Sequence, residues 1–239
     1  MAQGGDGTVR RKSNYDLLYY SAMMIALTIP SHASISPRWM VHTLDWGVLS
    51  TISSRIVQSV DSQRISPAVV TAVADESVMP VPFGNIYSFV DGTCDNSTGI
   101  PYIYGTYLDQ TFVDSQYNKA VSLSLSEASL PSVCGGKSLP SCTISRSSHG
   151  DPENPICARL VLSGFIVVLS KEDEEYDFAK QAIFHRHSSM EEWPEDHNWV
   201  VAKIDVQDIW LIDFFGGAAV LNIDAYKAVN LMSMEDEDK

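Results

Sequence analysis

The sequence predicts an α+β fold dominated by antiparallel strands, in which five or six strands form a small barrel with two or three helices at its edge. Short segments of alternating or continuous hydrophobicity recur along the chain, and turn residues such as Asp91-Gly92 and Gly216-Gly217 end them. Many of these segments are rich in Trp, Val, Ile and Phe, as is typical of strands. Hydrophobic residues form 45% of the 239 residues, which is enough to bury the core of one domain.

The strand patterns fall at Trp46–Ile52, Phe83–Val90, Ile100–Tyr107, Ala120–Leu125 and Ala158–Leu169. In the fourth of these segments the alternation is so regular that Val121, Leu123 and Leu125 are expected to share one face. Gly164 is expected to form a bulge or bend. The segment 199–215 predicts a pair of strands at the centre of the core, Trp199–Ile204 and Ile209–Phe215.

Three segments are predicted as helices. The first, Arg38–Leu44, follows Pro37 and leads into the first strand. The second begins near Ser170, which has the spacing of a capping box with Asp173, and runs to about His187. The third, Asp224–Leu231, closes the domain, which we place at residues 34–231. The segment 53–81 has no sustained period and is expected to be a long loop or insertion.

The charge balance excludes one class of partner. The chain carries 16 Lys and Arg against 30 Asp and Glu, which gives a formal net charge of −14 and an isoelectric point near 4.6. An acidic surface repels polyanions, so direct binding of nucleic acid is not expected. Residues 232–239 form an acidic tail that we expect to be a solvated chain end.

The N-terminus resembles a secretory leader. Arg10-Arg11-Lys12 precedes an apolar run at Leu17–Ile29, and Ser31-His32-Ala33 offers small residues for cleavage. We therefore predict a leader over residues 1–33, with an organelle transit peptide or a plain N-terminal helix as alternatives. The apolar run is too short to span a bilayer, and we expect no membrane span after leader removal. The predicted location is secreted or endomembrane and lysosomal, with plastid or mitochondrion as the alternative.

The cysteines agree with this route. The 4 cysteines, Cys94, Cys134, Cys142 and Cys157, allow three pairings, and their spacing does not suit a zinc site. Asn96-Ser97-Thr98 is a glycosylation sequon in a turn-like segment, so Asn96 is the predicted acceptor. Together these features indicate an oxidising compartment.

Residues that could carry chemistry give no enzyme signature. His185 and His187 lie two residues apart in a predicted helix and so cannot easily share a metal ion. His197 lies between Asp196 and Asn198 and could act as a base, although a turn histidine bonded to the backbone is the preferred interpretation. The aromatic residues of the predicted strands could line a pocket for a flat ligand, but core and interface residues are the preferred interpretation. They are Phe83, Tyr87, Phe89, Tyr102, Tyr104 and Tyr107.

Several blocks resemble the CREG family, the cellular repressors of viral early-gene-stimulated transcription. They follow the family's order over roughly residues 38 to 230. The blocks are Trp46–Ile52, Pro82–Asn85, Gly99–Tyr102, Asp151–Cys157, Trp193-Pro194 with His197–Trp199, and Phe215–Gly217. The resemblance implies a split β-barrel of the type found in pyridoxamine phosphate oxidase and other flavin-mononucleotide proteins. It also implies a homodimeric, secreted or endolysosomal glycoprotein without established activity, which acts by binding partners such as a receptor or a glycan-dependent sorting protein.

The resemblance carries further expectations about a cofactor. No cofactor is expected, because Tyr102 and Tyr104 stand where flavin-binding relatives are expected to carry Arg or Lys. The alternative is a flavin-mononucleotide oxidoreductase with Thr51 and Lys119 among its contacts.

The family pattern also pairs Cys134 with Cys157 in a disulfide. This chain departs from that pattern by insertions at 53–81 and 137–150, and Cys142 could compete for either partner.

Overall fold

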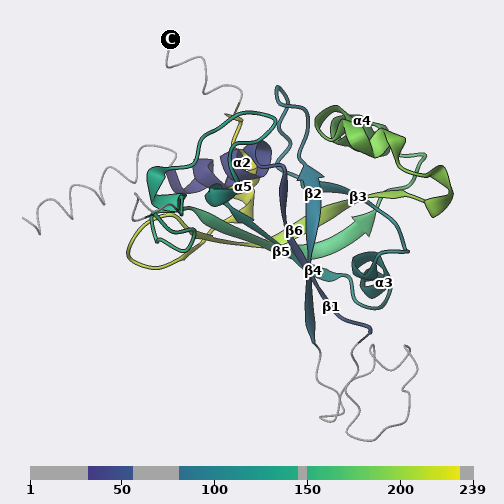
Figure 1. The fold of residues 1–239 in the computed structure, drawn as a ribbon, viewed down its shortest axis with the longest axis horizontal. Coiled ribbons are helices and arrows are strands. Elements are labelled where there is room, and N and C mark those ends of the chain that lie inside the picture. Colours follow the sequence, from purple (N-terminus) through teal and green to yellow (C-terminus); the bar gives the residue numbers. More distant parts are fainter. Residues whose placement is uncertain (1–31, 56–80, 145–149, 232–239) are drawn as a thin grey trace, which may run out of the picture.

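The computed structural model describes residues 32–55, 81–144 and 150–231 (Figure 1). The acidic tail, nearly all of the predicted leader, and parts of both predicted insertions fall outside these residues. Within the described residues, no helix is long and apolar enough to cross a bilayer. The first helix, α2 (His32–Thr43), starts earlier than predicted and includes Pro37.

The described strands form one antiparallel sheet of order β3-β2-β1-β4-β5-β6-β7. Their bounds are β1 Trp46–Ile52, β2 Pro82–Val90, β3 Tyr102–Gly105, β4 Ala120–Ser126, β5 Arg159–Val168, β6 Val200–Ile212 and β7 Ala219–Val220. An additional pairing of β3 with β6 sets Tyr102 opposite Lys203 and Gly105 opposite Val200. This pairing closes the first six strands into a barrel and confirms the predicted fold class.

The prediction of two strands within 199–215 was wrong, because β6 is one strand of 13 residues. Between the two predicted strands, Asp205, Gln207 and Asp208 are exposed, while Ile204, Val206 and Ile209 are buried. Asp205 continues the alternation, and the extra residue Gln207 interrupts it without forming a turn, since the strand resumes at Asp208. The register shifts between Ser163 and Gly164 of β5, so an irregularity occurs at the predicted position, but the extra residue belongs to the facing strand β6.

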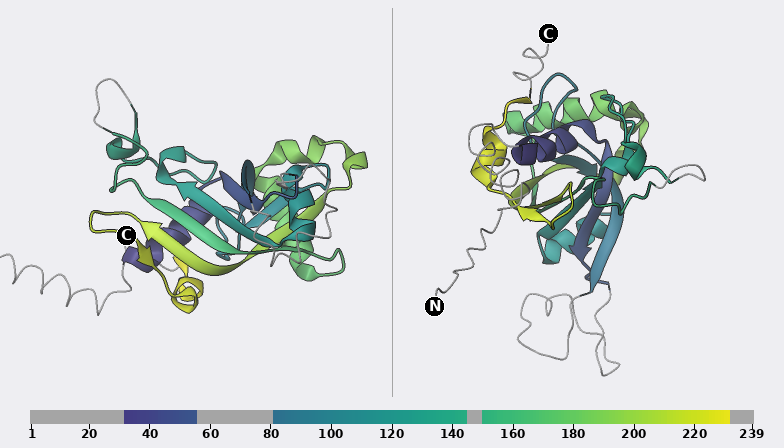
Figure 2. Two further views of the ribbon diagram at one scale, coloured as in Figure 1. Left: turned by 90° about the horizontal axis from the view of Figure 1, so that it is seen from below. Right: turned by 90° about the vertical axis from the view of Figure 1, so that its left-hand side faces the viewer.

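Helices gather at opposite ends of the barrel (Figures 1 and 2). α2 lies against α5 (Ile223–Ala228) at one end, and α4 (Glu174–Arg186) and α3 (Gln110–Tyr117) lie toward the other. Short 3-10 helices occupy Glu127–Ser129, Pro140–Cys142, Ser188–Glu192 and Glu195–His197. The helices α4 and α5 were predicted from the sequence, and α3 was not.

The core has two parts. The barrel interior contains the predicted face of β4, Val121, Leu123 and Leu125, packed with residues such as Leu49 and Leu160. A second cluster lies between the barrel wall and α4, and it includes Val90, Tyr102, Tyr176, Ala179, Ile183 and Val201. Both faces of β3 are therefore covered at Tyr102 and Ile103, which fixes the strand that closes the barrel.

Candidate functional site

The outer side of the barrel presents rows of side chains that are exposed or half-buried, and we call this surface the open face. Its central row follows the strand register through Ile86, Val48, Ser124, Val161, Trp210 and Val220. The row on one side is Gly84, Ser50, Ser122, Ser163 and Asp208, and the row on the other is Ser88, Trp46, Ser126, Arg159 and Ile212. The open face thus combines apolar residues with small hydroxyl residues.

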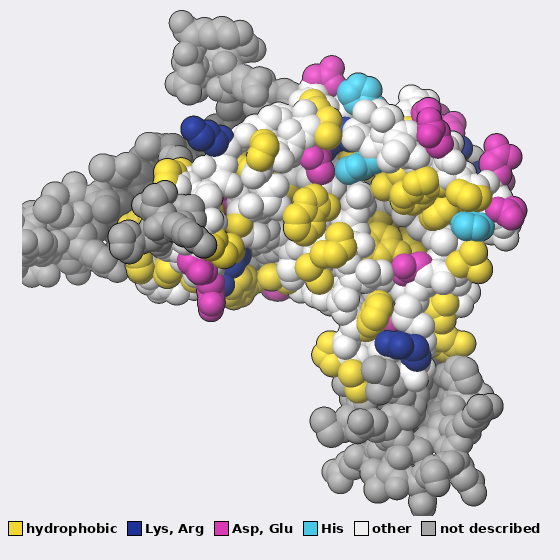
Figure 3. Space-filling view, viewed as in Figure 1, with side chains coloured by type: hydrophobic (Ala, Val, Ile, Leu, Met, Phe, Trp, Pro, Cys, Tyr) yellow, Lys and Arg dark blue, Asp and Glu magenta, His cyan; other side chains and the backbone are white. Residues whose placement is uncertain are grey.

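The open face is poor in charge. Among the described residues of the three rows, only Arg159 and Asp208 are ionised at neutral pH, although the whole chain carries −14. Trp46 is 44% exposed and Ile86 is 60% exposed. In Figure 3, hydrophobic side chains gather over the middle of the sheet, and charged side chains lie mostly nearer the margins of the view. A surface of this kind favours contact with another apolar surface.

A pocket of about 300 Å³ adjoins the Ile86 end of the open face, and we call it the aromatic pocket. Its lining residues are Asn85, Ile86, Tyr87, Ser88, Tyr104, Gly105, Thr106, Asp109, Met190, Trp193 and Trp199. Tyr104 stacks on Trp199 with 5.1 Å between ring centroids, and Trp193 lies 4.8 Å from Trp199. Trp193, from the Trp193-Pro194 block, therefore supplies one wall of this pocket together with Trp199.

Asp109 defines the polar end of the aromatic pocket. One carboxylate oxygen accepts from the backbone N–H of Thr111 at 2.8 Å and caps α3, and the other accepts from the Asn85 amide at 3.1 Å. Burial and the neighbouring Asp109 carboxylate raise the pKa of Tyr87 well above its ordinary value. Asp109 is the one ionised side chain among the described residues that line the pocket.

This lining does not fit the phosphate of a flavin mononucleotide. A phosphate needs cations or convergent donors, whereas the aromatic pocket offers a carboxylate. Thr51, a predicted flavin contact, is buried and donates its hydroxyl to Asp114 at 2.7 Å. Lys119 is exposed, and neither Thr51 nor Lys119 lines the pocket. The Tyr102 hydroxyl donates to Glu175 at 3.1 Å, so it is not directed at a ligand.

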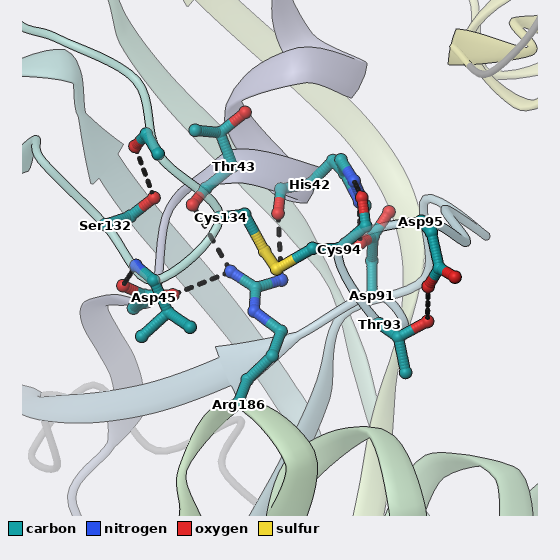
Figure 4. The surroundings of a disulfide bond; sticks show 12 residues. His42, Thr43, Asp45, Asp91, Thr93, Cys94, Asp95, Ser132, Cys134 and Arg186 are labelled. Carbon is teal, nitrogen blue, oxygen red and sulfur yellow. Dashed lines mark hydrogen bonds and ion pairs between the residues drawn. A yellow bond between two sulfur atoms is a disulfide. The ribbon is translucent and has the colours of Figure 1, made fainter.

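The disulfide pairing implied by the family pattern was wrong. Cys94 pairs with Cys134, and Cys142 pairs with Cys157. The backbone N–H of Val133 donates to Asp45 and brings the 132–135 loop toward the end of α2, where Cys94 lies (Figure 4). The backbone N–H of Asp151 donates to the Ser141 carbonyl, which brings the chain before Cys157 beside the Cys142 segment.

The predicted glycan acceptor, Asn96, is exposed in the loop between β2 and β3. The two residues that follow it hold this loop. The Ser97 hydroxyl donates to the buried carboxylate of Asp91 at 2.6 Å, and the Thr98 hydroxyl donates to the Asp91 carbonyl at 2.6 Å. The buried guanidinium of Arg38 also donates to the Ser97 hydroxyl at 2.9 Å. Attachment of a glycan at Asn96 stays a prediction.

His42 lies in the same network, and both of its ring nitrogens face acceptors. Nδ1 is 2.8 Å from the Asp91 carboxylate and Nε2 is 3.0 Å from the Cys94 carbonyl. Burial lowers the pKa of His42 and Arg186 opposes protonation, but the hydrogen bonds and the Asp91 charge outweigh both and raise the pKa. The folded state thus favours the imidazolium.

We expect His42 to stabilise the fold most in acid. A raised pKa in the folded state gives stability that is complete below the unfolded value near 6.5 and is lost as the pH rises through the folded value. Because a hydrogen bond to a charged group contributes about 1.5–3 kcal/mol, His42→Gln is expected to lower the Tm by several degrees at pH 5 and by less at pH 8. Thermal melts at the two pH values test this.

His187 supplies the matched control for this measurement. Burial lowers the pKa of His187, whose Nε2 lies 3.2 Å from the Phe89 carbonyl. The wild type therefore loses stability from His187 as the pH falls below 6.5. The Tm of His187→Gln should lie closer to that of the wild type, or above it, at pH 5 than at pH 8. A Tm deficit of His42→Gln that grows toward pH 8 would contradict the charged state of His42.

The other predicted chemical residues are not brought together. His185 is exposed, and the carbonyl of His197 accepts a hydrogen bond from Thr106 at 2.5 Å. The His197 ring lies 3.7 Å from the exposed Asp196 carboxylate. Within residues 32–55, 81–144 and 150–231, no group of three or more His, Cys, Asp or Glu residues could hold a metal ion.

Comparison with known proteins agrees with the fold. The chain matches structures at low sequence identity, including a heme binding protein from Mycobacterium smegmatis (TM-score 0.54, 15% identity, 84% of this chain and 62% of that chain). It also matches the Agrobacterium tumefaciens protein Atu2129, of unknown function, with a TM-score of 0.51 at 12% identity over 83% of this chain and 62% of that chain. At these identities the likeness concerns the fold alone.

Sequence comparison is more specific. The family described as CREG, beta-barrel, matches residues 28–228. Protein CREG1 of Gallus gallus is 33% identical over 199 residues, which cover 82% of this chain and 86% of that protein. Protein CREG2 of Homo sapiens is 32% identical over 201 residues, which cover 84% of this chain and 58% of that protein. With the barrel and these matches in agreement, the chain belongs to the CREG family.

Proposed function

We propose that this protein is a non-enzymatic homodimer of the secretory or endolysosomal route that acts by binding partners. The observation that carries the proposal is the open face, with its mostly apolar central row and only two charged residues, Arg159 and Asp208, among the described residues of its rows. Homodimer interfaces are more apolar than ordinary surfaces and are depleted of charge at their core. An effect of such a protein on growth or transcription would be indirect, because an acidic chain is poorly suited to bind DNA.

Dimerisation through the open face follows from electrostatics as well as from apolar area. Two chains of net charge −14 repel each other over most of their surfaces. The open face adds little to this repulsion, because its central row of described residues is uncharged. Its strands also provide a broad surface of the kind that a stable interface requires.

The leader pattern, the exposed sequon residue Asn96 and the two disulfides support the secretory route. The paired His42 and Asp91 support an acidic destination, since an imidazolium in this position stabilises the fold most at low pH. A receptor or a sorting protein that reads the glycan is the kind of partner that this route implies.

A second candidate is an oxidoreductase with a flat cofactor. The stacked wall of the aromatic pocket favours it, and a structural neighbour is a heme binding protein. Asp109 at the polar end opposes a phosphate-bearing cofactor, so we place this candidate second.

Native mass spectrometry of protein secreted from a eukaryotic host tests the proposal, because one spectrum reports mass, glycan and cofactor together. We expect a dimer of chains that begin near Ser34, each with two disulfides and a glycan that Asn96→Gln removes. An unglycosylated monomer at micromolar concentration, no heavier than the 26.3 kDa of the full chain, would contradict the dimer and the glycan. An added mass of about 456 Da per chain, that of flavin mononucleotide, would favour the oxidoreductase.

A further inference from the structure

A groove of about 360 Å³ crosses the open face. Trp46 lies at its β1 side and Trp210 at its β6 side, and Val48, Ser124 and Val161 of the central row line it between them. The groove is thus a shallow apolar depression in the surface that we propose as the dimer interface. It has the size to accept one large side chain.

Arg159 also lines this groove. One of its terminal nitrogens donates to the Glu153 carbonyl at 3.2 Å, and its Nε is inaccessible to solvent and has no hydrogen-bond partner. No carboxylate pairs with its guanidinium among the described residues. The planar face of an arginine in this state is suited to stacking on an aromatic ring.

Trp46 and Arg159 belong to the same row of the open face, on strands placed on either side of β4. In a face-to-face dimer the two-fold axis lies in the interface plane. If this axis runs parallel to the strands and passes over β4, each strand of one subunit faces the strand of the partner subunit that lies equally far from β4 on its other side. Strand β1 of one subunit then faces β5 of the partner subunit, and each row faces the same row of the partner subunit. Trp46 therefore faces Arg159 of the partner subunit.

We propose that Trp46 of each copy enters the groove of the other and stacks on the partner's Arg159. This inference rests on the proposed homodimer and assigns its anchor residues and the direction of its axis. The arrangement makes two equivalent cation–π contacts and fills the groove in both copies. It also sets the acidic Asp208 against the β2 end of the partner, where the same row holds the uncharged Gly84.

The other simple axis is less favourable. An axis that runs across the strands reverses the order of the rows, so that Trp46 would face the small Ser50 of the partner subunit. The groove would then stay unfilled, and Arg159 would face Ser163 of the partner subunit. Charge and shape therefore favour the axis parallel to the strands.

Sedimentation of four variants tests the anchor. Trp46→Ala should weaken the dimer by about 30-fold or more in Kd, the effect of losing a hot-spot residue of about 2 kcal/mol. Arg159→Met should also weaken the dimer, and the double variant should be clearly less impaired than the product of the two single effects. Ile144→Ala removes another exposed apolar side chain, 72% exposed and outside the rows, and should leave Kd within about threefold.

Crosslinking separates the anchor from the dimer itself. A benzoylphenylalanine at position 46, in a mixture of isotopically light and heavy chains, should join residue 46 to a peptide containing Arg159 of the other chain. A wild-type dimer with additive variants and crosslinks elsewhere would overturn the anchor and leave the dimer intact. A wild-type monomer would overturn both.

Discussion

Replacing Arg186 by Met is expected to lower the free energy of unfolding by about 3–5 kcal/mol, one of the largest effects of any single substitution. The Arg186 guanidinium is buried and donates to the carbonyls of His42 at 2.8 Å and Leu44 at 3.0 Å. It also donates to the Thr43 carbonyl and to the Asp45 carboxylate at 2.7 Å. Removing it leaves the carboxylate and the last carbonyls of α2 without their partner (Figure 4).

Chemical denaturation of Arg186→Met and wild type measures this effect. The matched control is Lys203→Met, because Lys203 pairs with Glu175 at 2.5 Å but the two side chains are 25% and 32% exposed. A partly exposed pair contributes about 1 kcal/mol or less, so the control should lose little stability. Equal losses in the two variants would show that the burial of Arg186 adds nothing.

Removing the Cys94–Cys134 disulfide is expected to cost about 4 kcal/mol, on the chain-entropy argument for the 40 residues that it spans. The Cys142–Cys157 bridge spans 15 residues, and its loss should cost about 3 kcal/mol. For a chain of this size, each kcal/mol lowers the Tm by about 2–4 °C. Thermal melts of Cys94→Ala with Cys134→Ala, and of Cys142→Ala with Cys157→Ala, compare the two bridges.

Peptide mapping of the unreduced protein checks the pairing on which these values depend. A peptide that joins Cys134 to Cys94 is expected. Recovery of Cys134 joined to Cys157, as the family pattern implied, would remove the basis for both stability values.

Most strands could be predicted because a strand with one buried face and one exposed face shows alternating hydrophobic and polar residues in the sequence. The prediction at Trp46–Ile52 coincides with β1, and the prediction at Ala120–Leu125 falls one residue short of β4. The helix α3 was missed because Gln110–Tyr117 shows no clear apolar stripe. The start of α3 nonetheless has a sequence signal, because Asp is a preferred residue at the N-cap of a helix. The Asp109 side chain accepts from the backbone N–H of Thr111, two residues later.

The buried charges could not be predicted, because local sequence does not show which charged residues meet a distant partner. Arg38, Asp91, Asp114 and Arg186 are each nearly or fully buried, and each bonds to residues far away in the chain. The aromatic pocket was missed for the same reason, since Asn85, Tyr104 and Trp199 come from three separate segments. The disulfide pairing depends on how two loops fold over α2, which cysteine spacing does not encode.

The Cys94–Cys134 bridge also bears on how this chain withstands proteases. β3, α3 and the strand β4 all lie between the two cysteines, as does the exposed turn at Tyr107 and Leu108. A single cut anywhere in this stretch therefore produces two pieces that the bridge still joins. Each of the remaining barrel strands stays intact on one of these two pieces. In a compartment rich in proteases, a nicked molecule of this kind keeps its full mass until the disulfide is reduced.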